Sequence, residues 1–202
     1  FALQAPAPRL AGPVARVAVV SGSCSPDTAR QIALAETQGF RAIRADAARV
    51  VDGAAWAAEE ARLLQAARVA LSDGDCPLVF TARGPEDAAL AAVATARQTA
   101  GVTAADATAR LSRGLGRVLA ALVADGVTRA VIAGGDTSSH ATAELGTVAL
   151  TAGAAIAPSV PLLQAHFADA ARAPLDLVLK GGQMGAAGLF PMIRDGVKNL
   201  SS

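Results

Sequence analysis

Short runs of apolar, often β-branched residues recur along this chain, and glycine, proline or charged residues bound most of them. Such runs are typical of strands that are buried on both faces and therefore need no polar alternation. We expect strands at residues 14–20, 40–44, 76–81, 129–133 and 175–179, of which the run at 40–44 is the weakest.

Amphipathic stretches between these runs predict helices. Ser25 and Pro26 suit the cap and the first position of a helix, because a serine hydroxyl pairs a free N–H and proline lacks one. Trp56 begins an apolar stripe at helical spacing, which we assign to the core. Helices are expected at residues 26–38, from Asp52 onward, from Pro85 until Gly101 ends it, and over a long stretch that Asp125 and Gly126 close.

The pattern changes after residue 145. Two apolar runs, 148–156 and 160–163, are separated by only a short Ala-Pro-Ser segment, too short for a helical crossover, so we expect an antiparallel pair. Elsewhere strands and helices alternate, which favours parallel strands. The predicted fold is therefore a three-layer α/β domain, with a mostly parallel central sheet flanked by helices and one antiparallel strand pair.

Three of the apolar runs end in loops of small residues, which we call the first, second and third loops. They read Gly-Ser-Cys-Ser-Pro-Asp-Thr at 22–28, Gly-Gly-Asp-Thr at 134–137 and Lys-Gly-Gly-Gln-Met-Gly at 180–185. Glycine lets backbone N–H groups approach an anion, and a helix N-terminus leaves several of them unpaired. In open α/β sheets ligands bind beyond the carboxyl ends of the strands. Together the loops predict a polyanion site; for any single loop, an ordinary strand-to-helix turn is the alternative.

Composition narrows the possible partners. Lys and Arg number 18 against 17 acidic residues, for a formal charge of +1, and aromatic residues make up 3%. The chain therefore has neither the excess of basic residues nor the aromatic residues for base stacking that are typical of nucleic-acid-binding proteins. Cys24 and Cys76 form neither a metal-ligand pattern nor a disulfide framework, which favours reduced cysteines and a cytoplasmic location. No apolar run approaches the roughly 20 residues needed to span a bilayer, so no membrane partner is expected.

The start of the chain has a different composition from the rest. Residues 1–13 are rich in proline and alanine, and the chain lacks an initiator methionine. Such a composition is typical of a linker. We therefore expect residues 1–13 to be a linker from a missing N-terminal domain, and residues 14–202 to form one domain.

Taken in order, the three loops resemble those of the C-terminal nucleotide-binding domain of the four-carbon acid sugar kinase family, over about residues 17–190. The helix that contains Gln31 and the Ala-Pro-Ser-Val-Pro turn at 157–161 add to the resemblance. In that family the third loop usually has a serine where this chain has Gly181 and an aromatic residue where it has Met184. One side-chain contact to the nucleotide is therefore lost here, while backbone contacts can remain.

The resemblance implies an ATP-dependent kinase for four-carbon sugar acids such as threonate, erythronate or their 3-oxo derivatives, with Mg²⁺ as a further cofactor. It places ATP on this domain and the sugar acid chiefly on a separate N-terminal domain. The acceptor-side catalytic residues are expected there, so this chain alone is expected to be inactive. The nucleotide-binding residues carried over are Ser23 or Ser25 in the first loop, Gly134, Gly135, Asp136 and Thr137 in the second, and Gly182 in the third.

Several assignments stay open at this point. Asp136 suits Mg²⁺, directly or through water, or the N-cap of the helix that follows, and Thr137 suits a phosphate or the same cap. For Lys180, a solvated strand end is favoured over neutralisation of the γ-phosphate. A non-catalytic module that senses a nucleotide or a sugar phosphate is the alternative to a kinase half. The apolar residues at 148–163 suit a homodimer.

Overall fold

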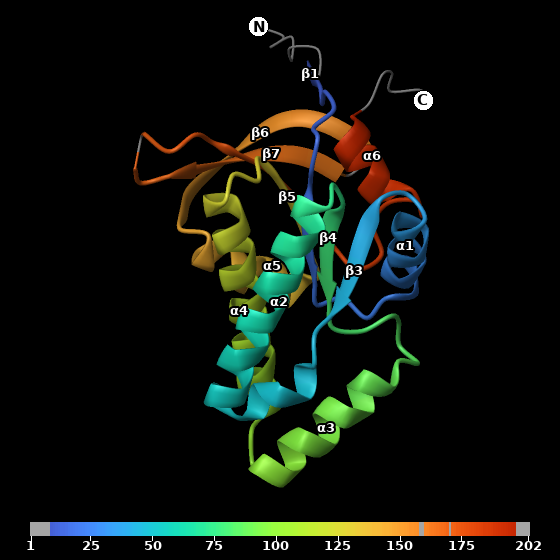
Figure 1. The fold of residues 1–202 in the computed structure, drawn as a ribbon, viewed down its shortest axis with the longest axis vertical. Coiled ribbons are helices and arrows are strands. Elements are labelled where there is room, and N and C mark those ends of the chain that lie inside the picture. The colour runs from blue at the N-terminus through green and yellow to red at the C-terminus, as the bar shows by residue number, and fades with distance from the viewer. Residues whose placement is uncertain (1–8, 158–159, 170, 197–202) are drawn as a thin grey trace, which may run out of the picture.

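Eight strands form one sheet in the computed structural model, which describes residues 9–157, 160–169 and 171–196. Their order across the sheet is β1-β6-β7-β8-β5-β2-β4-β3 (Figure 1). The strands are β1 (Arg9–Leu10), β2 (Ala18–Ser21), β3 (Phe40–Arg44), β4 (Cys76–Phe80), β5 (Arg129–Ala133), β6 (Thr147–Ala157), β7 (Val160–Phe167) and β8 (Leu175–Lys180). β7 is antiparallel to its neighbours β6 and β8, and the other pairs are parallel. The mostly parallel sheet and its antiparallel pair are thus confirmed.

Helices cover both faces of this sheet and complete the three predicted layers (Figure 1). On one face lie α2 (Gly53–Ser72), α4 (Ala104–Ala124) and α5 (Gly135–Glu144), and on the other lie α1 (Pro26–Glu36) and α6 (Leu189–Asp195). The 3-10 helix η1 (Ala47–Val51) follows β3, and α3 (Ala88–Ala100) follows β4. Both helices therefore lie past the carboxyl ends of these parallel strands.

Alternating side chains of the central strands build two cores. Val20 of β2 packs in one cluster with Leu63 of α2 and Leu115 of α4. Its neighbour Val19 packs in the other cluster with Ile32 of α1. This two-sided burial explains why the strands read as continuous apolar runs. Trp56 is buried, as predicted for a core residue, in a smaller cluster under η1.

Several element boundaries differ from those predicted. β2 begins at Ala18 rather than residue 14, because the backbone N–H of Val14 donates to Arg194 O at the end of α6 over 2.8 Å instead of joining the sheet. Helix α3 begins at Ala88 rather than Pro85, because Asp87 caps it: its Oδ1 accepts a hydrogen bond from Ala89 N over 3.0 Å. The expected strand at 76–81 ends one residue earlier, at Phe80, and β6 and β7 are longer than the apolar runs that predicted them.

The predicted linker lies mostly outside the described residues. Within it, Arg9 and Leu10 form β1 and pair with Ala154 and Ala155 of β6 in parallel register. Among the described residues, no helix combines the length and apolarity that crossing a bilayer requires.

Candidate functional site

Three adjacent strands, β2, β5 and β8, end at the same level. Ser21 of β2 pairs with Ala133 of β5, and Ala133 pairs with Lys180 of β8. Two backbone hydrogen bonds then tie the loops that follow: Gly22 N donates to Ala133 O over 3.0 Å, and Gly134 N donates to Lys180 O over 2.9 Å. The first, second and third loops therefore meet at one edge of the sheet.

The first and second loops approach each other too closely for a side chain at Gly22. A Cβ atom there would lie 2.2 Å from Oγ1 of Thr137, and Thr137 is itself buried. Gly134 has a φ of +117°, which residues with a Cβ rarely adopt. The two glycines therefore allow the backbones of the two loops to pack directly against each other.

We expect Gly22→Ala to destabilise the protein by about 1–3 kcal/mol, because the added methyl group must displace Thr137 or the loop itself. Chemical denaturation checks this value. Gly12→Ala is the matched control, since a Cβ at Gly12 meets nothing within 4 Å. A denaturation midpoint for Gly22→Ala equal to that of the control would show that the two loops can move apart without lowering the free energy of unfolding.

The second loop opens α5 without a side-chain cap. Gly134 is the N-cap residue, and it makes no side-chain capping hydrogen bond. The alternative of an N-cap role for Asp136 or Thr137 is therefore wrong, because the helix begins at Gly135 and both residues already lie within its first turn. Asp136 is exposed in the first turn of α5, while Thr137 is turned inward against Gly22.

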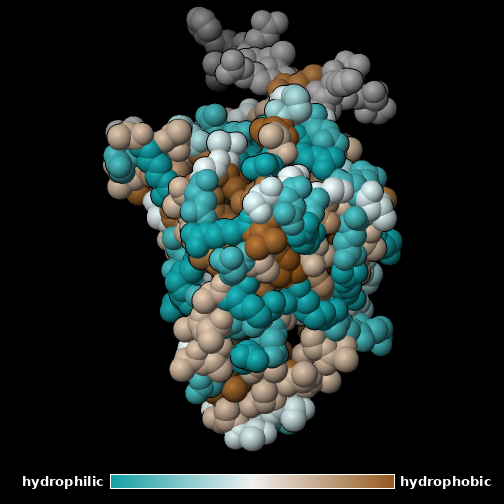
Figure 2. Space-filling view, viewed as in Figure 1, coloured by the Kyte–Doolittle hydropathy of each residue, from teal (hydrophilic) through white to brown (hydrophobic). Residues whose placement is uncertain are grey.

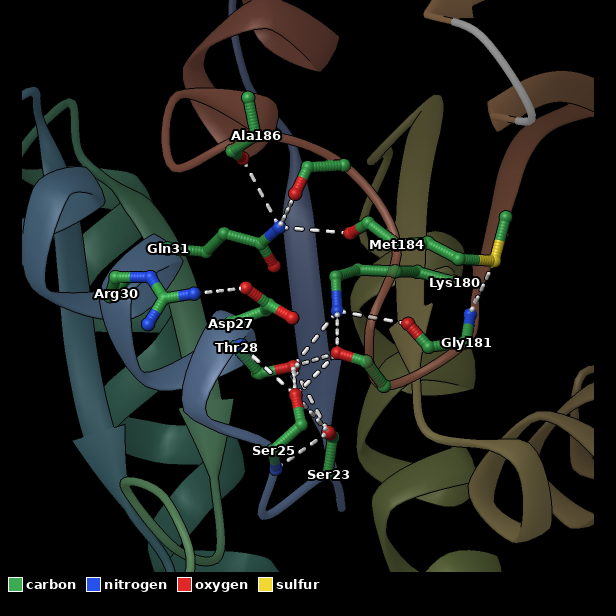
Figure 3. Close-up of polar contacts among 12 residues, drawn as sticks. Ser23, Ser25, Asp27, Thr28, Arg30, Gln31, Lys180, Gly181, Met184 and Ala186 are labelled. Carbon is green, nitrogen blue, oxygen red and sulfur yellow. Dashed lines mark hydrogen bonds and ion pairs between the residues drawn. The ribbon is translucent and has the colours of Figure 1, made fainter.

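Lys180 is fully buried, which contradicts its prediction as a solvated strand end. Its Nζ donates to Thr28 Oγ1 over 2.8 Å and to the carbonyl oxygens of Gly181 and Gly182 over 3.0 Å each (Figure 3). Burial lowers the pKa of Lys180 to about 8. Thr28 of α1 and the carbonyl groups of the third loop surround the ammonium group, which is why it is shielded from solvent.

Hydroxyl groups of the first loop complete this network. Ser25 Oγ accepts from Thr28 N over 3.1 Å, as a helix cap should, and it also donates to Gly182 O. Ser23 Oγ lies 3.0 Å from Thr28 Oγ1. The predicted residues Ser23, Ser25 and Gly182 are thus brought together, and they join the first loop to the third. Figure 3 shows the two serines of the first loop beside Thr28.

A second buried donor fixes the far end of the third loop. Gln31 of α1 donates from Nε2 to the carbonyl oxygens of Met184, Gly185 and Ala186, over 2.9, 3.0 and 3.1 Å. Met184 in turn folds back, so that its Sδ accepts from Gly181 N over 3.2 Å. A Cβ at Gly181 would lie 3.0 Å from this sulfur, so glycine at 181 and methionine at 184 fit each other.

The three loops form one end of a cavity of about 840 Å³. Its other end comes from η1, α3 and α4 and is mostly apolar, with Arg97, Thr108 and Ser112 as its polar residues. The apolar residues there include Val50, Leu90, Val93, Ala107 and Leu111. Helix α3 contributes no buried residue of its own, and Figure 2 shows tan, apolar residues over this helix at the lower end of the molecule. The cavity therefore has a polar end rich in backbone groups and an apolar end.

Asp136 is the one acidic residue among the described residues that line this cavity. The described part of the chain holds no group of three or more potential metal ligands. Mg²⁺ usually binds through one or two carboxylates, with phosphate oxygens and water completing its shell. A single exposed carboxylate at the polar end fits a metal that arrives with a phosphate ligand, and does not fit a metal held by the protein alone.

The sequence motifs included Thr28 and the helix that contains Gln31, but they gave neither residue a role in holding the loops. Both lie on the face of α1 that also buries Ile32 and Ala35. Polar residues within an otherwise apolar helical stripe were the available signal, because a buried polar side chain needs partners.

Comparison with known proteins agrees with the resemblance found in the sequence. A family model described as a nucleotide-binding C-terminal domain matches residues 18–190. The 3-oxo-isoapionate kinase of Paraburkholderia graminis is 42% identical over 198 residues, which cover 96% of this chain and 42% of that protein. The 3-oxo-tetronate kinase of Methylobacterium radiotolerans is 36% identical over 86% of this chain and 37% of that protein. The chain thus spans about two fifths of the length of these relatives.

Solved structures share the fold. A Haemophilus influenzae protein described as belonging to a family of unknown function superposes with a TM-score of 0.71 at 26% identity, covering 92% of this chain and 41% of that one. A Bordetella bronchiseptica domain of unknown function, described as a domain-swapped dimer with bound citrate, gives a TM-score of 0.67 at 25% identity, covering 93% of this chain and 42% of that one.

Proposed function

Since this chain belongs to the four-carbon acid sugar kinase family as its nucleotide-binding C-terminal domain, we propose that it is the ATP-binding half of a kinase for four-carbon sugar acids. The observation that carries the proposal is the meeting of three glycine loops at one end of a single cavity. Backbone N–H groups and a helix N-terminus suit phosphates. The apolar end suits a nucleoside base.

In this proposal the second loop receives the phosphates. Gly134 and Gly135 leave the start of α5 open to the cavity, and its backbone N–H groups carry the positive end of the helix dipole. Gly182, Ser23 and Ser25 also line this end of the cavity. The base then lies between α3 and α4, against Leu90 and Leu111.

Mg²⁺ is the proposed second cofactor, and Asp136 is the residue that would hold it. When bound, the metal ion supplies positive charge that offsets the charge developing on the transferred phosphoryl group. The chain's own part is to place one carboxylate at the polar end of the cavity and to leave the remaining coordination positions to phosphate and water.

The sugar acid is proposed to bind mainly outside this chain. Relatives named as 3-oxo-isoapionate and 3-oxo-tetronate kinases make 3-oxo acids the first acceptors to test, ahead of threonate and erythronate. We propose a cytoplasmic enzyme that dimerises through β6, where Val148 is 63% exposed.

We expect the chain to bind ADP and ATP in the presence of Mg²⁺ and to phosphorylate no sugar acid by itself. Calorimetry measures the binding, and a coupled assay for ADP release measures turnover. Absence of binding at millimolar nucleotide would overturn the proposal. Binding without turnover, even after the chain is joined to a relative's N-terminal half, would instead indicate a nucleotide-sensing module.

A further inference from the structure

We propose that Lys180 is a positioning residue for the nucleotide phosphates. Its buried ammonium fixes the first and third loops against each other and supplies positive charge beneath the polar end of the cavity. This inference rests on the proposed function. It adds Lys180 to the binding site as a residue that does not contact the phosphates itself but positions the third loop, which does.

The ammonium group of Lys180 is saturated with neutral acceptors. Its three hydrogens have three partners within 3.0 Å: the hydroxyl of Thr28 and the carbonyl oxygens of Gly181 and Gly182. Twelve salt bridges occur among the described residues, and none of them includes Lys180. The charge is therefore hydrogen-bonded but has no carboxylate in contact with it.

A buried charge without a counter-ion is costly for the folded protein. Burial lowers the pKa of this lysine to about 8, in keeping with that cost, and Asp27 on α1 offsets only part of it. An apolar side chain would complete the end of β8 at lower cost. A binding partner that brings negative charge explains the lysine, and the cavity beside it is the place where such a partner would bind.

The loop that Lys180 holds is part of the cavity wall. The carbonyl groups of Gly181 and Gly182 point to the ammonium. In a trans peptide the N–H points away from the C=O, so the N–H groups of Gly182 and Gln183 are directed away from the lysine. Both residues line the cavity. Lys180 thus orients two backbone donors and stands directly behind them.

Gln31 provides a matched comparison, because it holds the same loop without any charge. Its amide contacts three carbonyl groups of the residues that follow Gln183, just as Lys180 contacts two carbonyl groups and a hydroxyl. Gln31 is also fully buried. If fixing the loop were sufficient, the two side chains would be equally important for binding.

The test compares Lys180→Met with Gln31→Met by calorimetry, using ADP and adenosine as ligands and thermal unfolding to verify the fold. We expect Lys180→Met to raise the Kd for ADP at least tenfold and to leave the Kd for adenosine within about threefold. Gln31→Met disturbs the same loop without removing a charge, and it is expected to raise the Kd for ADP by a factor at least three times smaller than Lys180→Met does. Lys180→Gln, which keeps two donors but no charge, is expected to behave like Lys180→Met and takes its place if the methionine variant does not fold.

The other outcomes overturn the inference. Equal losses of ADP affinity in the lysine and glutamine variants would show that only the position of the loop matters. Equal losses for ADP and adenosine in Lys180→Met would show a general structural role. Unchanged ADP binding by both lysine variants would remove Lys180 from the site. If the unaltered chain binds no ADP, the proposed function fails first, and the inference fails with it.

Discussion

Replacing Gly135 with valine should abolish detectable ADP binding while leaving the unfolding temperature within a few degrees of its original value. The fold should tolerate the change, because Gly135 is exposed, it is the first residue of α5, and a Cβ there meets nothing within 4 Å. Binding should not tolerate it, because the valine side chain would fill the space in which a phosphate approaches the backbone of the second loop. Calorimetry with ADP and Mg²⁺, together with thermal unfolding, measures both effects.

Gly53→Val is the control for this experiment. Gly53 is likewise exposed, is the first residue of α2, and has nothing within 4 Å of an added Cβ, but it does not line the cavity. Its substitution should leave ADP affinity unchanged. If Gly135→Val binds ADP as tightly as the control does, the phosphates lie elsewhere in the protein.

The layered fold could be predicted because its strands are buried on both faces. A continuous apolar run such as residues 130–133 of β5, which is buried throughout, signals a central strand whatever its neighbours are. The cap formed by Ser25 and Pro26 could be predicted for a similar reason, since it depends on residues adjacent in sequence. The start of α3 was not predicted correctly. Pro85 suits the first position of a helix, but Asp87 is the residue that caps α3, and its carboxylate also accepts a hydrogen bond from Arg83 N.

The site could be predicted only where it depends on local sequence. The three loops are visible as glycine and serine following apolar runs, and the register of β2, β5 and β8 brings them together. The burial of Lys180 depends instead on how α1 packs, and Thr28 and Gln31 of that helix are about 150 residues away from it in sequence. The apolar end of the cavity joins η1, α3 and α4, and no motif marks it.

Replacing Asp136 with asparagine should lower the turnover of the proposed kinase, assembled by joining the chain to a relative's N-terminal half, at least a hundredfold if Asp136 holds Mg²⁺. Asparagine keeps the shape of the side chain but removes its charge, so about 2.7 kcal/mol of transition-state stabilisation would be missing, at 1.36 kcal/mol per tenfold. The alternative is a purely structural role. An exposed acid in the first turn of α5 then interacts only with the helix dipole, which contributes about 0.3–1 kcal/mol to stability and nothing to turnover.

Asp106→Asn separates these two roles. Asp106 is also an exposed acid in the first turn of a helix, α4, where its Oδ2 accepts from Thr103 Oγ1 over 2.7 Å, and it does not line the cavity. Both substitutions should lower stability slightly through the lost dipole interaction, but only Asp136→Asn should lower turnover, and added Mg²⁺ should restore part of it. Steady-state kinetics of the chain joined to a relative's N-terminal half, measured over a range of Mg²⁺ concentrations, supplies the comparison. Near-normal turnover of Asp136→Asn at saturating Mg²⁺ would exclude the metal role, because the charge that a bound Mg²⁺ requires from the protein would then come from another residue.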